Sequence, residues 1–253
     1  MDTIYNKISL SEKDNKNLAV ATIIKVTGST PRKSGTKMII FENGETYGTI
    51  GGGSLEKKVI SDAINIIGKN KSEIFDHQLE EDLSMGCGGN VQVFIEPIIA
   101  KKELIIFGAG HIGKILAKFA NQLNFKITLV DNREDILNKI KENNYTIVEE
   151  NFRTYLPKIN FNKNIFISVV THNHDYDKEI VAYCAKKEFA YLGMIGSKTK
   201  IKKFREYYLK ENILNNEDMS KIDWPMGIDI ECQTPEEITI SILAKLIDVR
   251  AKL

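Results

Sequence analysis

The sequence predicts an α/β protein in which a doubly wound parallel sheet follows a smaller mixed α+β domain. The most informative observation is the glycine motif 108–113, Gly-Ala-Gly-His-Ile-Gly, between the apolar run 104–107 and the helix-like segment 114–123. A second apolar run, 127–130, ends in Asp131. From residue 103 onward, strand-like and helix-like segments alternate. This order is typical of a Rossmann-like domain.

Composition and charge narrow the class of protein. The chain has 253 residues, with 35 basic against 34 acidic side chains, which gives no electrostatic reason to expect nucleic acid as a partner. No apolar run reaches the roughly 20 residues that span a bilayer, so we expect no membrane partner. Residues 1–10 are polar and lack the apolar core of a signal peptide. We therefore expect a cytoplasmic protein.

Residues 1–100 are predicted to form the mixed α+β domain, and residues 101–253 the Rossmann-like domain, with a boundary near 97–102. A buried strand and an Asn-Gly hairpin turn are the clearest signals in the first domain. Ser54 is a good N-cap for a helix with apolar residues at helical spacing. The expected strands are 18–26, 37–41, 73–79 and 91–95, and the helix starts after Ser54.

The alternating segments of the second domain are each short enough to form one strand or one helix. The Thr-Pro-Glu-Glu sequence at 234–237 is a helix start, and the apolar face that follows predicts packing on a sheet or on the first domain. The expected strands are 103–107, 126–130, 146–149, 164–170 and 191–194, and the expected helices are 112–123, 134–141, 178–187 and 198–209.

The glycine motif is a candidate phosphate site. Gly108 permits the tight turn, Gly110 lets the backbone approach a pyrophosphate, and Gly113 lets helix and strand pack closely. Amide groups at the helix N-terminus face the anion, and His111 would lie over the ligand. Asp131 is placed to bind a ribose hydroxyl. A Rossmann-type domain can also keep this turn without binding a dinucleotide.

Three cysteines in a chain of this length form no disulfide framework. Cys87 lies between Gly86 and Gly88, where backbone amides can stabilise a thiolate, the form that ligates soft metals. A glycine turn that merely tolerates a small residue is the simpler alternative. We expect Cys184 in the core of a helix, and a structural role for Cys232.

Two further loops suit an anion. Residues 28–36 mix hydroxyls and glycines with Arg32 and Lys33, a combination that suits a phosphate or another oxyanion. A second candidate, at a helix start, consists of Gly51, Gly52, Gly53 and Ser54. Solvated, flexible loops are the alternative interpretation.

The segment 171–177, Thr-His-Asn-His-Asp-Tyr-Asp, follows an expected strand. It therefore lies at the carboxyl edge of the sheet, where open α/β sheets bind ligands. His172 and His174 could bind a metal or transfer protons, or the loop could simply be polar and cap the next helix. Gly196 and Ser197 follow another strand and lie at the same edge.

Together these motifs resemble the XdhC/CoxI family, the accessory proteins of xanthine dehydrogenase and related molybdenum hydroxylases. The resemblance extends over nearly the whole chain, and it depends on the order and spacing of several short motifs. These motifs are residues 28–35, 51–56, 85–89, 108–113, 171–174, 193–197 and 234–237. The sequence departs from the expected pattern at Glu231 and Cys232, where relatives are expected to carry glycine and alanine.

The resemblance implies a maturation protein rather than an enzyme. Members of this family bind the molybdenum cofactor, a molybdopterin, protect it while a cysteine desulfurase adds the sulfido ligand, and deliver it to the apo-hydroxylase. By this hypothesis Cys87 contacts the molybdenum, while Arg32, Lys33 and the loop 51–54 hold the pterin phosphate. The glycine loop takes either a nucleotide or part of the cofactor. The resemblance also indicates a homodimer, and the apolar last helix offers a surface for it.

Two other classes of function stay open. One is an NAD-dependent oxidoreductase in which Asp131 binds the ribose and His172 or His174 is the acid/base. The other is a nucleotide-sensing interaction module without chemistry of its own. Binding of NAD, and the effect of Cys87→Ser on partner binding, distinguish these alternatives.

Overall fold

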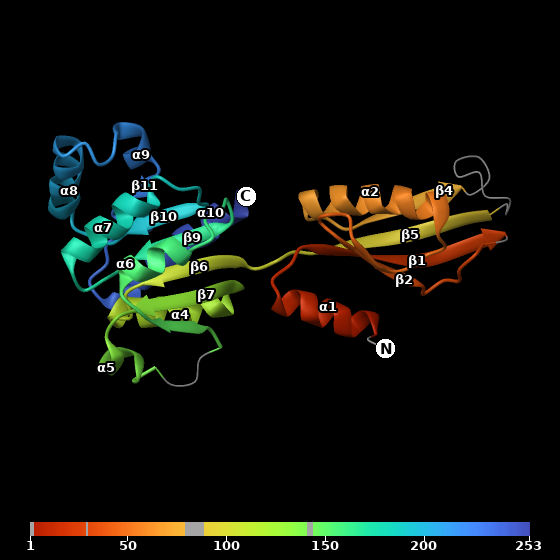
Figure 1. Ribbon diagram of the computed structural model, residues 1–253, viewed down its shortest axis with the longest axis horizontal. Coiled ribbons are helices and arrows are strands. Elements are labelled where there is room, and N and C mark those ends of the chain that lie inside the picture. The colour runs from red at the N-terminus through yellow and green to blue at the C-terminus, as the bar shows by residue number, and fades with distance from the viewer. Residues whose placement is uncertain (1–2, 29, 79–88, 141–143) are drawn as a thin grey trace. The chain divides into compact units, whose positions relative to one another are not determined.

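The computed structural model describes residues 3–28, 30–78, 89–140 and 144–253 (Figure 1). The chain divides into two compact units, Met1–Ala100 and Lys101–Leu253. Each unit has its own sheet and its own hydrophobic core.

The first unit contains a five-stranded antiparallel sheet of order β3-β2-β1-β5-β4. Alternate residues of its central strand face opposite sides: Ala19 and Ala21 join one core cluster, and Leu18 and Val20 join another. The strands are β1 (Leu18–Gly28), β2 (Lys37–Phe41), β3 (Thr46–Gly48), β4 (Glu73–Gln78) and β5 (Gly89–Ile98).

Two helices cover the faces of this sheet (Figure 1). Helix α2 (Gly53–Lys69) buries an apolar stripe that includes Leu55 and Val59 against one face. Helix α1 (Ile4–Lys13) packs Ile4 and Ile8 against the other. The sequence motifs do not predict α1, since only these two apolar residues mark its inner face.

The second unit contains a six-stranded sheet of order β11-β10-β9-β6-β7-β8 in which all neighbours are parallel. The order changes direction at β6, so the crossover helices lie on both faces of the sheet. The strands are β6 (Lys102–Phe107), β7 (Phe125–Asp131), β8 (Thr146–Glu149), β9 (Ile165–Val169), β10 (Tyr191–Met194) and β11 (Ile222–Asp223).

Helices α4 (His111–Gln122) and α10 (Pro235–Ala251) cover one face of this sheet, and α7 (His174–Cys184) and α8 (Lys198–Lys210) cover the other. The predicted fold class, a Rossmann-like sheet preceded by an antiparallel α+β unit, is therefore confirmed. Cys184 is fully buried, as predicted. The shorter helices are α5 (Glu134–Leu137), α6 (Phe152–Tyr155), η1 (Leu156–Lys158) and α9 (Asn216–Ser220).

One predicted helix end and two predicted helix starts differ from the observed ones. Helix α5 ends at Leu137, short of the predicted end at 141. Helix α2 begins at Gly53 with Gly52 as its N-cap, so Ser54 lies inside the first turn. Helix α7 begins at His174 rather than at 178, because the Asn173 side chain accepts a hydrogen bond from the amide of Asp175 and caps the helix there.

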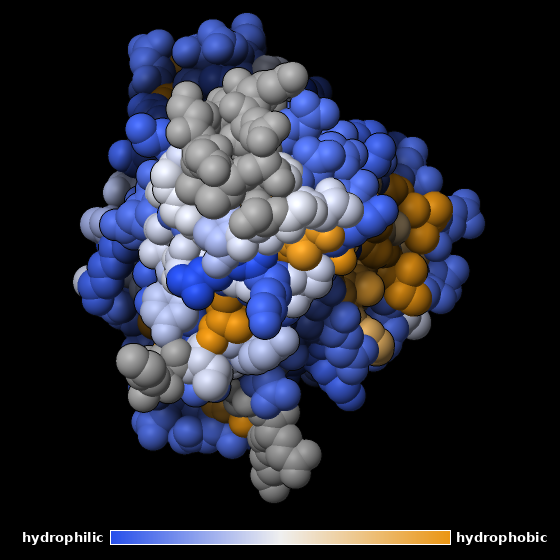
Figure 2. Space-filling view, turned by 90° about the vertical axis from the view of Figure 1, so that its right-hand side faces the viewer, coloured by the Kyte–Doolittle hydropathy of each residue, from blue (hydrophilic) through white to orange (hydrophobic). Residues whose placement is uncertain are grey.

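The surface drawn in Figure 2 is mainly hydrophilic, with hydrophobic side chains gathered in a few places. Helix α10 contributes the exposed residues Ile240 and Ile247 to the surface of the second unit. Among the described helices, none has the combination of length and apolar character that crossing a bilayer requires.

Candidate functional site

The glycine motif forms a close-packed turn between β6 and α4. Gly108 has φ +110°, and a Cβ atom there would lie 2.5 Å from the carbonyl oxygen of Val170. A Cβ atom on Gly113 would lie 1.8 Å from the carbonyl oxygen of Gly108. Gly110 is the N-cap of α4 and has open space around it. The structure thus requires glycine at 108 and 113 for packing, whereas Gly110 leaves room for a ligand.

Asp131 ends β7 beside this turn, and its side chain has no solvent exposure. Its carboxylate accepts hydrogen bonds from the amides of Ala109 (2.7 Å) and Arg133 (3.0 Å). The Arg133 guanidinium adds two more, from Nε to Oδ1 (2.9 Å) and from Nη2 to Oδ2 (2.7 Å). Burial by itself raises the pKa of Asp131, but these hydrogen bonds outweigh it and leave the pKa below its usual value.

The ribose contact of Asp131 stays a prediction, and the hydrogen bonds that its carboxylate already accepts oppose it. Each carboxylate oxygen of Asp131 already has two donors. A ribose hydroxyl would have to replace one of them.

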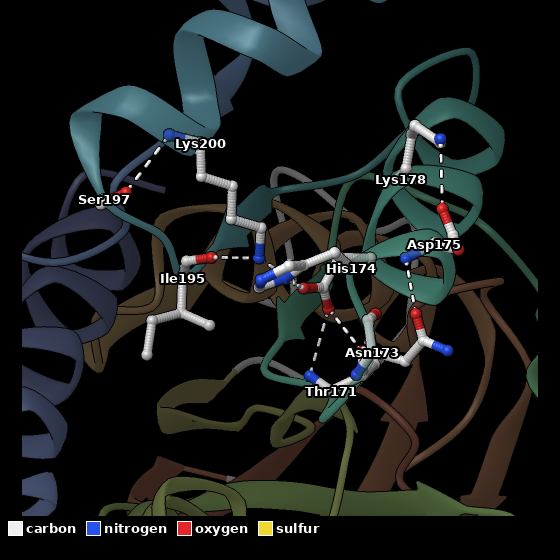
Figure 3. Close-up of polar contacts among 9 residues, drawn as sticks. Thr171, Asn173, His174, Asp175, Lys178, Ile195, Ser197 and Lys200 are labelled. Atoms are coloured by element: carbon white, nitrogen blue, oxygen red, sulfur yellow. Dashed lines mark hydrogen bonds and ion pairs between the residues drawn. The ribbon is translucent and has the colours of Figure 1, made fainter.

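The loop between β9 and α7 lies at the same carboxyl edge, next to the glycine turn. A Cβ atom on Gly108 would approach the Cα of Thr171 to 2.8 Å. The Thr171 amide and hydroxyl donate to Oδ1 of Asp177, at 3.2 and 2.6 Å. Asp177 is fully buried, and these two hydrogen bonds, drawn as dashed lines at Thr171 in Figure 3, tie the loop to its carboxylate.

Lys200 reaches the same carboxylate from α8. Its Nζ atom lies 2.6 Å from Oδ2 of Asp177 and 3.2 Å from the carbonyl oxygen of Ile195 (Figure 3). The lysine chain passes over the turn at Gly196, where a Cβ atom would lie 3.0 Å from the lysine Cδ. The Ser197 side chain accepts a hydrogen bond from the Lys200 amide and caps α8. These contacts join Gly196 and Ser197 to the loop that contains His172 and His174.

The histidines of the motifs are placed at this edge with exposed side chains. His111 is the first residue of α4. The His172 ring contacts Tyr176, and His174 Nδ1 lies 3.7 Å from Oδ2 of Asp177. In the described parts of the chain, no three His, Cys, Asp or Glu side chains gather to hold a metal ion. A metal ion bound by His172 and His174 would therefore have no third protein ligand among the described residues.

In the first unit, the loop between β1 and β2 presents two cations. The hydroxyls of Thr30 and Thr36 donate to the carbonyl oxygens of Arg32 and Lys33, and the Gly35 amide donates to β1. The backbone is thereby held while the Arg32 and Lys33 side chains remain exposed. Neither side chain is engaged in an ion pair or hydrogen bond with a described residue, so both fit an incoming phosphate.

The loop before α2 already binds an anion, the side chain of Glu56. This carboxylate accepts hydrogen bonds from the Thr49 hydroxyl, the Ile50 amide and the Gly52 amide. Burial by itself raises the pKa of Glu56, but these donors more than offset it and hold the pKa below its usual value. The sequence indicated an anion-binding loop here, and the structure supplies the anion from the chain itself. Phosphate binding by Gly51, Gly52, Gly53 and Ser54 stays a prediction.

The predicted metal ligand, Cys87, lies outside the described residues together with Gly86 and Gly88. Cys232, in the segment that departs from the expected family pattern, is partly exposed before α10. Burial raises the pKa of Cys184 far above its usual value, which leaves this thiol protonated and inert.

The sequence motifs miss three ion-pairing residues of the carboxyl edge. Arg133 and Lys200 lie outside the motifs, and Asp177 lies within the motif 171–177 without an assigned role. The sequence does contain a signal for Lys200. Helix α8 has Lys198 and Lys200 in its first turn, where the helix dipole makes a cation unfavourable. Such a cation needs a specific partner, here a buried carboxylate. Arg133 gave no signal beyond its position two residues after Asp131.

The glycine turn and the parallel sheet define a protein with a Rossmann-type domain. The chain belongs to the XdhC family. Residues 104–246 match the family model for the XdhC Rossmann domain, and residues 12–78 match that for the XdhC and CoxI family. The resemblance drawn from the sequence motifs is thereby confirmed.

Relatives align along the whole chain. The chain is 29% identical over 253 residues to YqeB of Escherichia coli K12, but the match covers 98% of the chain and 46% of YqeB. The chain thus spans about half the length of that relative. A Bacillus subtilis protein named as a probable subunit of xanthine dehydrogenase is 21% identical over 340 residues, covering 100% of this chain and 99% of that protein.

The fold resembles a crystal structure described as a xanthine dehydrogenase from Bacillus halodurans. The TM-score is 0.55 at 24% identity, covering 100% of this chain and 96% of the other. At this identity the similarity concerns the fold alone.

Proposed function

We propose that this protein is an accessory factor of a xanthine dehydrogenase-type molybdenum hydroxylase. It binds the molybdenum cofactor, supports its sulfuration by a cysteine desulfurase, and delivers it to the apo-hydroxylase. Membership of the XdhC family supports this proposal, as does the name of the Bacillus subtilis relative. The protein acts as a cofactor chaperone rather than as a catalyst.

The observation that carries the proposal is the pair of exposed cations at Arg32 and Lys33. Their backbone is fixed by Thr30, Gly35 and Thr36, while their side chains face solvent. A molybdopterin ends in a phosphate group, and a planar guanidinium beside an ammonium group suits such a dianion. In this proposal the two side chains hold the cofactor by its phosphate.

Cys87 completes the proposal from the sequence. Its thiolate is a soft ligand and would contact or guard the molybdenum. The Rossmann-type domain offers a second surface for the ligand, formed by the glycine turn and the loops that contain His172, His174, Gly196 and Ser197. We further propose a homodimer that acts in the cytoplasm.

Retention of molybdenum tests this function. The purified protein is mixed with isolated cofactor and passed through a desalting column, and the molybdenum that stays with the protein is measured. We expect the wild type to retain it, and both Cys87→Ser and the double variant Arg32→Gln/Lys33→Gln to retain less. The matched control is Lys69→Gln, an exposed cation at the far end of α2. If the wild type retains none, the proposal fails.

An NAD-dependent oxidoreductase is the second candidate, because the glycine turn has the geometry of a pyrophosphate site. His172 or His174 would then be the acid/base. Calorimetric titration with NAD decides between the two: micromolar binding would favour the oxidoreductase, and no binding at millimolar concentration would count against it. A nucleotide-sensing module would instead bind its hydroxylase partner equally well with and without Cys87→Ser.

A further inference from the structure

The Asp131 carboxylate is the most completely satisfied acid of the carboxyl edge. It has no exposed surface, and each of its oxygens accepts one backbone amide and one guanidinium N–H. The Arg133 side chain that supplies the two guanidinium bonds is itself 26% exposed. The carboxylate is therefore covered from the solvent side by Arg133.

In a dinucleotide-binding Rossmann domain, the acid at this position accepts hydrogen bonds from the ribose hydroxyls. Here Nε and Nη2 of Arg133 take one oxygen each. A vicinal diol, with its two neighbouring O–H donors, would need the same two acceptor positions. We propose that Arg133 sets the ligand specificity of the glycine-loop site by occupying the positions of a ribose diol, so that the site rejects adenosine-type dinucleotides.

The exchange of donors is unfavourable for a ribose. A bidentate guanidinium–carboxylate pair is charge-assisted, and its hydrogen bonds are roughly twice as strong as bonds between neutral groups. The backbone also fixes Arg133, because its amide donates to the same carboxylate. A neutral diol would have to displace this fork and leave a guanidinium without its counter-ion. We therefore expect the site to bind ligands that place no diol against the Asp131 carboxylate.

This specificity does not depend on which ligand is natural. It concerns only Asp131, Arg133 and the glycine turn, all of which lie in the second unit. Retention of molybdenum can fail while the inference holds, and the inference can fail while molybdenum is retained. The two experiments therefore report on separate properties.

The test is a calorimetric titration of the full chain with NAD. We expect the wild type to show no binding at millimolar NAD, and Arg133→Ala to bind NAD at least about tenfold more tightly, since two acceptor positions become free. NAD should also raise the melting temperature of Arg133→Ala and leave that of the wild type unchanged. Adding Asp131→Asn to Arg133→Ala should remove most of the gain.

The matched control is Arg153→Ala, because Arg153 also forms a bidentate pair with a carboxylate, that of Glu179. This variant should behave like the wild type toward NAD. Should Arg133→Ala not fold, as judged by circular dichroism, Arg133→Lys supplies the measurement, since an ammonium group lacks the fork that covers both oxygens. Equal NAD affinity in the wild type and the folded variant, or a gain with Arg153→Ala, would overturn the inference.

Discussion

The Nζ atom of Lys200 lies 2.6 Å from Oδ2 of Asp177, and this ion pair links helix α8, which follows β10, to helix α7, which follows β9. Asp177 is fully buried, and the Lys200 side chain is 12% exposed. The hydroxyl and amide of Thr171 take the other carboxylate oxygen. One buried acid therefore fixes two of the loops that form the carboxyl edge.

Removing the cation of this pair should destabilise the second unit. Lys200→Met leaves a buried carboxylate without its charge partner, a change that typically costs about 3 kcal/mol. We expect a lower midpoint of urea unfolding for Lys200→Met. Lys198→Met is the matched control, because Lys198 is exposed in the same helical turn. Equal midpoints for the two variants would show that the pair contributes no stability.

The loop before α2 should depend on Glu56 in a comparable way. Glu56→Gln replaces a charged acceptor of three hydrogen bonds by a neutral one, and we expect a loss of about 1–3 kcal/mol. The amides of Ile50 and Gly52 should then exchange their hydrogens faster with solvent, which hydrogen-exchange mass spectrometry can measure. Glu45→Gln, an exposed acid in the hairpin before β3, should change neither quantity. Unchanged exchange at the loop in Glu56→Gln would contradict this role.

The strand–turn–helix at 104–123 could be predicted because its signals are local. Gly108 adopts a positive φ and Gly113 packs against the turn, and glycine is the residue that meets both requirements, so both positions can be recognised in the sequence. The alternation of the five longer strands with helices in the second unit could also be predicted, whereas β11 and the short helices α6, η1 and α9 were not. Cys184 was placed in the core because its neighbours repeat at helical spacing.

The pairs that shape the site are not local. Asp177 and Lys200 lie 23 positions apart, and only the packing of β9 beside β10 brings them together. Arg133 is near Asp131 in sequence, but the two hydrogen bonds from its guanidinium to the Asp131 carboxylate depend on side-chain positions that the sequence does not show. The glycine loop at 51–54 was predicted to bind an anion, but Glu56 was not recognised as that anion. An acid in the first turn of a helix is common, because it also interacts favourably with the helix dipole.

The stabilisation by Asp131 should depend on pH in a defined direction. The folded-state pKa of Asp131 lies below its usual value, so its contribution is fully present above the unfolded-state value of about 3.9. It is lost as the pH falls further, through the folded-state pKa. We expect the difference in unfolding free energy between the wild type and Asp131→Asn to be constant near neutral pH and to shrink below about pH 4. A difference that already declines at about pH 6 would contradict the depressed pKa.

In the glycine turn, Gly113 is needed for packing, whereas Gly110 leaves open space for a ligand. A Cβ atom on Gly113 would lie 1.8 Å from the Gly108 carbonyl oxygen, so Gly113→Ala must move helix α4 away from β6. Such overpacking costs about 1–3 kcal/mol, and this overlap calls for at least the upper end. Gly110→Ala meets no atom within 4 Å and should cost only about 1 kcal/mol, as an N-cap change. Thermal unfolding compares the two variants directly. Equal melting temperatures would show that the turn relaxes around an added methyl group, and that glycine at 113 is not required by the packing of α4 on the sheet.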